Sequence, residues 1–186
     1  GAGLIGLPMP LRPLQLLWLN MVTDTFPALA LALEPGDPGV MRRPPRDPRE
    51  AILSRDFVLS ILLYGGLITV STLVAFAWAL AWAPLQAVTV AFTTLALAQV
   101  LHLGNARSEG PMFAGGRFWS NRYAVAAVVV SALLQLAALY VAPLAATLRV
   151  VPLGLDAWLV VLACSVAPAV AGQGLKYLGR GAQLGR

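Results

Sequence analysis

The sequence predicts an all-α integral membrane protein, a bundle of five transmembrane helices. Of its 186 residues, 59% are hydrophobic and only 11% are charged, and the mean hydropathy is +0.77. A soluble domain carries about a quarter charged residues. Apolar stretches in this chain repeatedly reach the roughly 20 residues that an α-helix needs to cross the hydrocarbon layer.

Turn signals and short polar segments separate the predicted spans. Gly and Pro residues over 1–13 indicate a loop before the first span, and Glu34 with the following Pro35 ends that span. Pro84 marks a tight turn after the second span, and Pro143 closes the fourth. The predicted spans cover residues 14–34, 57–82, 85–103, 122–142 and 156–178.

The first span carries polar side chains near its middle. Asn20 and Asp24 are four residues apart and Asn20 and Thr23 three apart, so on an α-helix they share one face. A carboxylate at mid-membrane costs about 2.5–3.5 kcal/mol on insertion scales, which makes Asp24 a candidate functional residue. Pro27 has no N–H, so the carbonyl of Thr23 loses its helical partner. Carboxylate, amide, hydroxyl and carbonyl oxygens together suit a hard cation.

Helix packing is the alternative interpretation of these residues. Asn and Thr in membrane helices often only hydrogen-bond to a neighbouring helix, and a Pro is often only a kink. For Asn20 or Thr23 taken alone we therefore favour packing. Asp24 differs, because a membrane carboxylate needs a partner and the chain offers no Lys or Arg at that depth.

Other spans hold weaker polar signals. Gln99 and His102 are three residues apart on one helical face, which would suit a cation path or a proton relay. We favour packing for His102, because it lies near the end of its span where water can reach it. The amide oxygen of Gln99 either faces the Asp24 cluster or bonds between helices, and both readings stay open. Gln135 has no polar neighbour in its own span, so we expect a helix contact.

The basic residues indicate topology. If the first span runs from outside to cytoplasm, the loops at 35–56 and 104–122 and the C-terminal tail are cytoplasmic and hold all of the 13 Lys and Arg residues except Arg12 and Arg149. The positive-inside rule favours this arrangement, with a cytoplasmic C-terminus.

Composition also excludes several classes of site. The net charge of +5 is spread over loops, so nucleic acid is not an expected partner. The single Cys164 lies in an apolar segment without a second Cys or a nearby His, so the chain can form neither an internal disulfide nor a zinc site. No segment offers a Gly-rich phosphate-binding loop.

Several stretches together resemble one family. LQLLWLNMVTDTFPALALALEP, followed by MRRPPR at 41–46, closely resembles the sixth membrane helix and the next cytoplasmic loop of type II P-type cation pumps. Calcium pumps of the sarcoplasmic-reticulum and secretory-pathway kinds and their bacterial relatives carry this pattern. Supporting matches are FTTLALAQVLHLGNARSE at 92–109, FWSNRYAV at 118–125 and VPLGLDAWLVVL at 151–162.

This resemblance implies a ligand set. The Asn, Thr and Asp of the family's sixth helix bind the transported ion, and they map onto Asn20, Thr23 and Asp24. Gln99 falls where two-calcium pumps place a glutamate on the eighth helix. This difference argues against a second calcium site that depends on the eighth helix, as in family members that move one calcium. The transported cation would be calcium or a similar ion.

The resemblance also implies missing partners. The chain would supply the sixth to tenth helices, so we expect residues 1–186 to be the C-terminal transmembrane domain of a larger protein. Its start at Gly1 and its odd number of spans favour the same expectation. The phosphorylated Asp and the domains that handle ATP and magnesium would belong to the remainder of the pump, which would be the partner of this chain in the lipid bilayer.

The sequence thus favours the membrane part of an ATP-driven cation pump in a bacterial plasma membrane, with no ATP-hydrolysing residues of its own. Two alternatives remain open. The chain could be a segment of a secondary transporter or channel, whose kinked polar helix binds substrate without an ATP domain. It could also be a structural membrane scaffold without a working ion site.

The charge distribution predicts which loops face the cytoplasm. Single cysteines introduced at Ser54 and Ser108 should react with a membrane-impermeant thiol reagent only from the cytoplasmic side, and one at Leu148 only from outside. Labelling of the first two positions from opposite sides would rule out the arrangement.

Overall fold

The computed structural model describes residues 6, 8–34, 55–106 and 121–184, and these residues are helical with short connections and no strand. The all-α prediction is confirmed for this part of the chain. The elements are α1 (Pro13–Leu19), the π-helix η2 (Asn20–Asp24), α2 (Thr25–Ala32), α3 (Arg55–Trp82), the 3₁₀ turn η4 (Pro84–Gln86), α4 (Ala87–Ala106), α5 (Arg122–Tyr140), α6 (Ala142–Leu148) and α7 (Leu155–Leu184).

Four helices in the described residues are long and apolar enough to cross a membrane. They are Phe57–Trp82, Pro84–Leu103, Arg122–Tyr140 and Leu155–Leu175. The first predicted span is also helical, because α1, η2 and α2 follow one another without a gap from Pro13 to Ala32. Its middle turn is π-helical, a geometry that the sequence did not predict.

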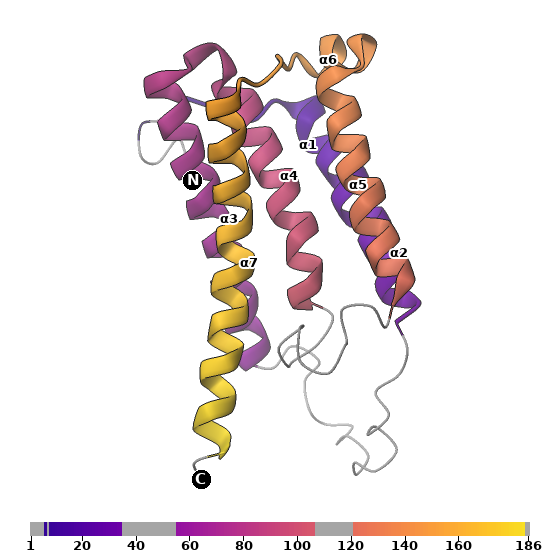
Figure 1. The fold of residues 1–186 in the computed structure, drawn as a ribbon, viewed down its shortest axis with the longest axis vertical. Coiled ribbons are helices and arrows are strands. Elements are labelled where there is room, and N and C mark those ends of the chain that lie inside the picture. Colours follow the sequence, from indigo (N-terminus) through magenta and orange to yellow (C-terminus); the bar gives the residue numbers. More distant parts are fainter. Residues whose placement is uncertain (1–5, 7, 35–54, 107–120, 185–186) are drawn as a thin grey trace.

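The helices pack as two groups joined by α4. Helices α3, α4 and α7 pack against one another, while α5 packs against α2 (Figure 1). Helix α4 also contacts α5 and η2, so it lies between the two groups. Its span is 56% buried, twice or more the buried share of α3 or α7. Helix α4 is therefore the element around which the others are arranged.

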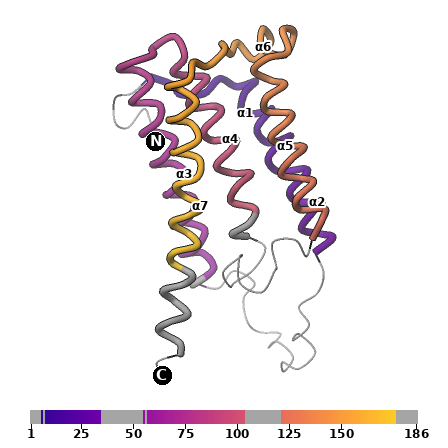
Figure 2. Tube along the Cα trace, in the orientation of Figure 1, coloured from indigo at the N-terminus to yellow at the C-terminus, as the bar shows by residue number. Residues whose placement is uncertain are grey.

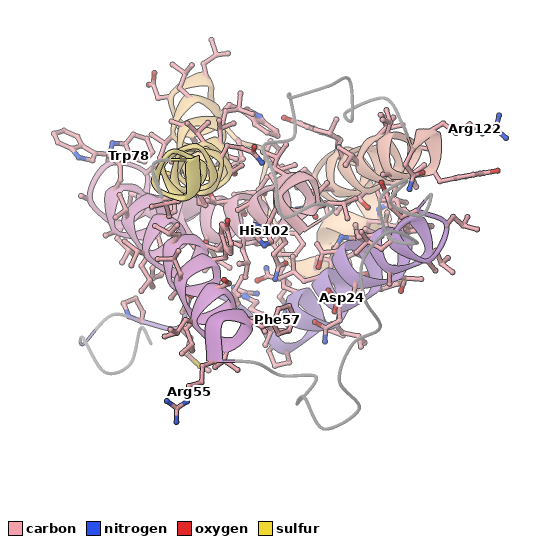
Figure 3. The ribbon with its side chains drawn as sticks, turned by 90° about the horizontal axis from the view of Figure 1, so that it is seen from below. Asp24, Arg55, Phe57, Trp78, His102 and Arg122 are labelled. Atoms are coloured by element: carbon pink, nitrogen blue, oxygen red, sulfur yellow. The ribbon has the colours of Figure 1, made fainter. Side chains whose placement is uncertain are left out.

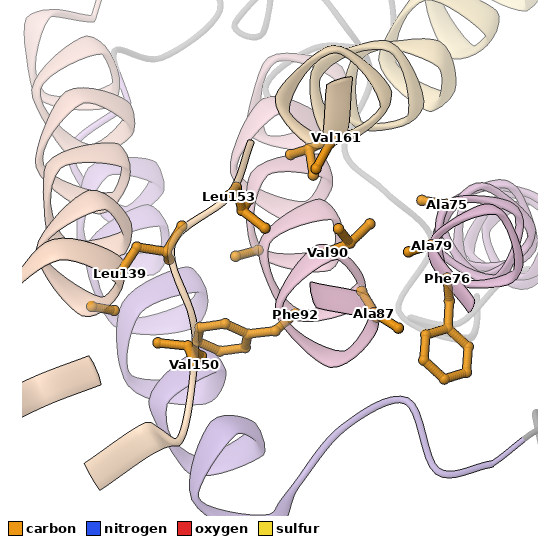
Figure 4. Close-up of a cluster of buried hydrophobic side chains, with 14 of the residues drawn as sticks. Ala75, Phe76, Ala79, Ala87, Val90, Phe92, Leu139, Val150, Leu153 and Val161 are labelled. Atoms are coloured by element: carbon orange, nitrogen blue, oxygen red, sulfur yellow. The ribbon is translucent and has the colours of Figure 1, made fainter. Parts of the chain in front are cut away.

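Small residues allow the helices to approach closely at the centre. Ala75 and Ala79 of α3 and Ala87 of α4 are fully buried beside larger side chains such as Phe92 and Val161 (Figure 4). Lipid tails are as apolar as these side chains, so association in a membrane depends on close packing rather than on exclusion of water. Large apolar side chains on the opposite faces of the helices are exposed, as expected for contact with lipid.

The described ends of the helices fall into two sets. The start of α1, the turn between α3 and α4, and α6 with its following loop lie at one end of the bundle, and the ends of α2 and α4 lie at the other (Figure 2). Arg12 caps the start of α1 and Arg149 caps the end of α6, so both belong to the first set. Their side of the membrane stays a prediction. The predicted loops at 35–54 and 107–120, including Ser54 and Ser108, lie outside the described residues.

At this end of the bundle, buried side chains connect α1 to the end of α6, and α4 to the loop that follows α6. Gln15 is fully buried; its Oε1 accepts a hydrogen bond from the backbone N–H of Arg12 at 3.0 Å, and its Nε2 donates to the carbonyl of Leu148 at 3.0 Å. At the same end, Thr89 accepts from the backbone N–H of Val151 at 3.0 Å. These contacts hold α1 and the loop after α6 against the bundle.

Candidate functional site

The polar residues predicted in the first span all lie in the π-helix. Asn20 begins η2 and Asp24 ends it, with Thr23 just before Asp24. A π-helix closes i→i+5 hydrogen bonds instead of i→i+4 and occurs mostly as single-turn bulges, frequently at functional sites. The helix thus departs from α-helical geometry at the segment that the sequence analysis singled out.

Pro27 accounts for a shortage of donors at this segment. In the i→i+4 pattern residue 27 would donate to the carbonyl of Thr23, and in the i→i+5 pattern it would donate to that of Val22. Because proline has no N–H, one of these two carbonyls lacks its helical donor in either pattern. The sequence analysis predicted that only the Thr23 carbonyl loses its helical donor, because that prediction assumed a regular α-helix.

The three polar side chains do not point the same way. Asn20 and Asp24 are exposed, whereas Thr23 is buried, with 6% of its surface accessible. The hydroxyl of Thr23 donates to the carbonyl of Leu19 at 2.9 Å and lies 3.4 Å from Oδ1 of Asp24. The expectation of one shared face rested on α-helical spacing, and the π-helix alters that spacing.

Asp24 lies on a part of the helix that the described neighbours leave open. In a view along the bundle, Asp24 and His102 project into the region between α2, α3 and α4 (Figure 3). Within the described ranges no three His, Cys, Asp or Glu side chains come together. Within the π-helical turn Asp24 is the one carboxylate, beside the neutral side chains of Asn20 and Thr23.

Gln99 is an available oxygen on the adjoining helix. It lies on α4, which contacts η2. Its Oε1 is buried, and no hydrogen bond reaches it from the residues that the structure describes. A buried acceptor without a donor costs about 1–3 kcal/mol, so this atom has a strong preference for a donor or a cation. Its orientation toward the π-helix stays a prediction.

The other predicted polar residues make helix contacts. The ring of His102 lies 4.7 Å from that of Tyr64 between ring centroids, which connects α4 to α3 and agrees with a packing role. Oε1 of Gln135 accepts a hydrogen bond from Nε1 of Trp18 at 3.3 Å, so the expected helix contact of Gln135 is confirmed.

Ser131 of α5 and Asn121, which directly precedes α5, were not singled out by the sequence analysis. Both contact the continuous run of α1, η2 and α2, called the broken helix below. Ser131 is fully buried, and its hydroxyl donates to the carbonyl of Val22 at 2.9 Å. Asn121 is 2% exposed; its Nδ2 donates to the carbonyl of Ala30 at 2.9 Å and to Oε2 of Glu34 at 2.6 Å.

Asn121 performs a second role at the start of its own helix. Its Oδ1 accepts from the backbone N–H groups of Tyr123 at 2.9 Å and Ala124 at 3.1 Å. An Asn directly before an apolar helical run is a typical N-cap, so that half of its role was readable from sequence. Nothing in the local sequence distinguishes Ser131.

Comparison with known proteins gives a consistent result. The family model described as "Cation transporting ATPase, C-terminus" matches residues 8–178. A "Calcium-transporting ATPase" of Bacillus subtilis is 38% identical over 170 residues, which are 90% of this chain and 19% of that protein. "Calcium-transporting ATPase 1" of Bacillus cereus is 32% identical over 191 residues, covering 93% of this chain and 21% of the relative. The chain thus spans about a fifth of the length of these relatives.

Proposed function

Because the chain belongs to the family of cation-transporting ATPase C-terminal regions, which form part of the membrane domain of P-type pumps, we propose that it supplies part of the ion-binding site of an ATP-driven calcium pump. The observation that carries the proposal is the helical break at η2, which gathers Asn20, Thr23 and Asp24 within one π-helical turn. Calcium is the proposed ion because the bacterial relatives are named for its transport.

The chemistry of the segment supports a hard cation. Calcium takes about 6–8 oxygen ligands, among them carboxylates, side-chain amides and backbone carbonyls. The broken helix offers one carboxylate at Asp24, the amide oxygen of Asn20, the hydroxyl oxygen of Thr23 and a backbone carbonyl released by Pro27.

This chain would provide only a share of the coordination shell. Gln99 is our proposed auxiliary ligand from α4, and the remaining ligands would come from the rest of the pump. We propose that residues 1–186 are the C-terminal transmembrane domain, that other domains handle ATP and magnesium, and that the assembly works in a bacterial plasma membrane with the C-terminus of this chain in the cytoplasm. The exposed Asn20 and Asp24 would then face the helices supplied by the remainder of the pump.

Asp24 should be indispensable for transport, because it supplies the only formal negative charge that offsets the removal of water from the cation. Asp24→Asn keeps the shape of the side chain and removes its charge. We expect it to abolish calcium-dependent transport by the full-length pump in vesicles. Asp156→Asn, the same change at an exposed residue in the first turn of α7, serves as the control and should leave transport intact. Normal calcium affinity and rate in Asp24→Asn would show that the site lies elsewhere.

Gln99→Ala should have a smaller effect. A neutral amide oxygen contributes about as much as one hydrogen bond, so we expect the calcium affinity to fall by no more than about tenfold, or about 1.4 kcal/mol. Calcium-dependent ATP hydrolysis by the full-length pump measures the shift. Complete loss of calcium dependence would promote Gln99 from an auxiliary to a principal ligand.

Pro27→Ala tests the role of the released carbonyl. Restoring an N–H at residue 27 lets it recapture a carbonyl of the segment, so we expect a lower calcium affinity. Pro168→Ala is the matched control, because Pro168 also lies buried inside a helix, α7, and not in the broken helix. An equal loss of affinity in both variants would indicate a general effect of removing a membrane proline.

The chain expressed alone should hydrolyse no ATP, because it contains no Gly-rich loop that could hold the nucleotide phosphates. The full-length pump in the same membranes is the positive control. Vanadate-sensitive phosphate release by the purified chain would contradict the division of labour proposed above.

A further inference from the structure

The hydrogen bond from Ser131 to Val22 joins two helices at the π-helix itself. Both residues are fully buried, and the hydroxyl oxygen of Ser131 lies 2.9 Å from the carbonyl oxygen of Val22. Three threonine hydroxyls bond within their own helix, Thr69 to Gly65, Thr72 to Ile68 and Thr147 to Pro143, whereas Ser71 and Ser165 donate to carbonyls on another helix, those of Cys164 and Thr94. Ser131 instead donates to the segment that carries the proposed ligands.

The acceptor of this bond lies in the π-helical turn, five residues before Pro27. If the i→i+5 pattern extends to Val22, its helical donor would be residue 27, which is proline and has no N–H. An unpaired carbonyl inside a membrane costs several kcal/mol. The Ser131 hydroxyl gives the Val22 carbonyl a donor from α5 in either helical pattern.

The pattern of the segment decides where the ligands lie. An α-helix turns by about 100° per residue, so slipping the hydrogen-bond pattern by one residue rotates one half of the helix by about that angle against the other. In the observed pattern Asn20 and Asp24 are exposed and Thr23 is buried, so a slip would change how Thr23 lies relative to the other two. A contact that keeps the pattern in place therefore keeps the observed arrangement of the proposed ligands.

Among the described residues, two other hydrogen bonds join the α5 segment to the first helix, one on each side of η2. Gln135 accepts from Trp18, in the half before the break, and Asn121 donates to Ala30, in the half after it. These two bonds fix the halves against α5 but do not reach η2. Ser131 lies between them along α5 and bonds to the π-helical turn.

We propose that Ser131 is a positioning residue of the cation site, holding the π-helical turn that carries Asn20, Thr23 and Asp24 in its observed pattern. This inference rests on the function proposed above. The hydroxyl does not touch the cation; it acts through the backbone of Val22.

Ser131→Ala in the full-length pump tests the proposal. We expect the calcium concentration for half-maximal ATP hydrolysis to rise about tenfold, equivalent to about 1.4 kcal/mol and close to the net worth of one buried hydrogen bond. The maximal rate at saturating calcium should change little, because calcium binding itself then selects the correct pattern. Ser131→Thr, which retains a hydroxyl donor, should restore most of the affinity.

Ser165→Ala is the matched control. Ser165 is also fully buried and donates to a carbonyl on another helix, that of Thr94, at 3.2 Å. The helical donor for Thr94 is Ala98, which has an N–H, so this carbonyl is not short of a partner. Ser165→Ala should leave the calcium affinity within about twofold, although it loses a bond of the same kind. Equal shifts in both variants, or a loss of maximal rate and thermal stability without a shift in affinity, would overturn the positioning role.

A double-mutant cycle with Pro27 provides an independent measurement. In the Pro27→Ala background, residue 27 regains an N–H that can donate to Val22, so removing the Ser131 hydroxyl should cost much less than in the parent. Additive effects of the two substitutions would contradict the shared acceptor. If Ser131→Ala fails to accumulate in the membrane, Ser131→Cys keeps nearly the same volume with a weak donor and should show the same direction of shift.

Asp24→Asn measured alongside separates the two proposals. If it abolishes calcium dependence and Ser131→Ala leaves the affinity unchanged, only the positioning role is wrong. If Asp24→Asn leaves calcium affinity normal, the site is not at the π-helix, and the proposed function of this segment and the role of Ser131 both fail.

Discussion

Every backbone carbonyl inside a membrane needs a donor, and Pro27 removes one in the middle of the first helix. The run from Pro13 to Ala32 is not a uniform α-helix but contains the π-helical turn η2 just before this proline. A hydroxyl from α5 donates to the carbonyl of Val22 in that turn. In water the freed carbonyl would be solvated at little cost, so the constraint exists because the helix lies in hydrocarbon.

Helix α5 acts as a support for the broken helix. It contacts the half before the break through Gln135, the break through Ser131 and the half after it through Asn121. Asn121 combines this with capping its own helix, so the start of α5 and the end of α2 are fixed by one buried amide. These contacts connect α5 to the first helix before, at and after the turn where its regular hydrogen bonding changes.

The other half of the bundle provides a rigid background for this arrangement. Helices α3, α4 and α7 pack through small residues, and α4 extends from that packed group to η2 and α5. The broken helix itself places Asn20 and Asp24 on exposed surface, in keeping with a site completed by other segments of a pump. The π-helical turn itself holds one carboxylate, Asp24, beside the neutral side chains of Asn20 and Thr23, so the proposed affinity for calcium depends on ligands from elsewhere.

The sequence by itself determined the helical class, the extent of the long helices and the segment where chemistry is concentrated, because hydropathy over about 20 residues and a membrane Asp are local signals. It also predicted the helix contact of Gln135, since an isolated amide in an apolar span needs a partner. It could not predict the π-helix, and its expectation that Thr23 shares a face with Asn20 and Asp24 assumed α-helical spacing, whereas Thr23 is buried and the other two are exposed. The carbonyl of Val22, inside this turn, accepts a hydrogen bond from Ser131, which is 109 residues away in the chain. Only the tertiary structure brings that hydroxyl to Val22, and no pattern in either helix alone records the pairing.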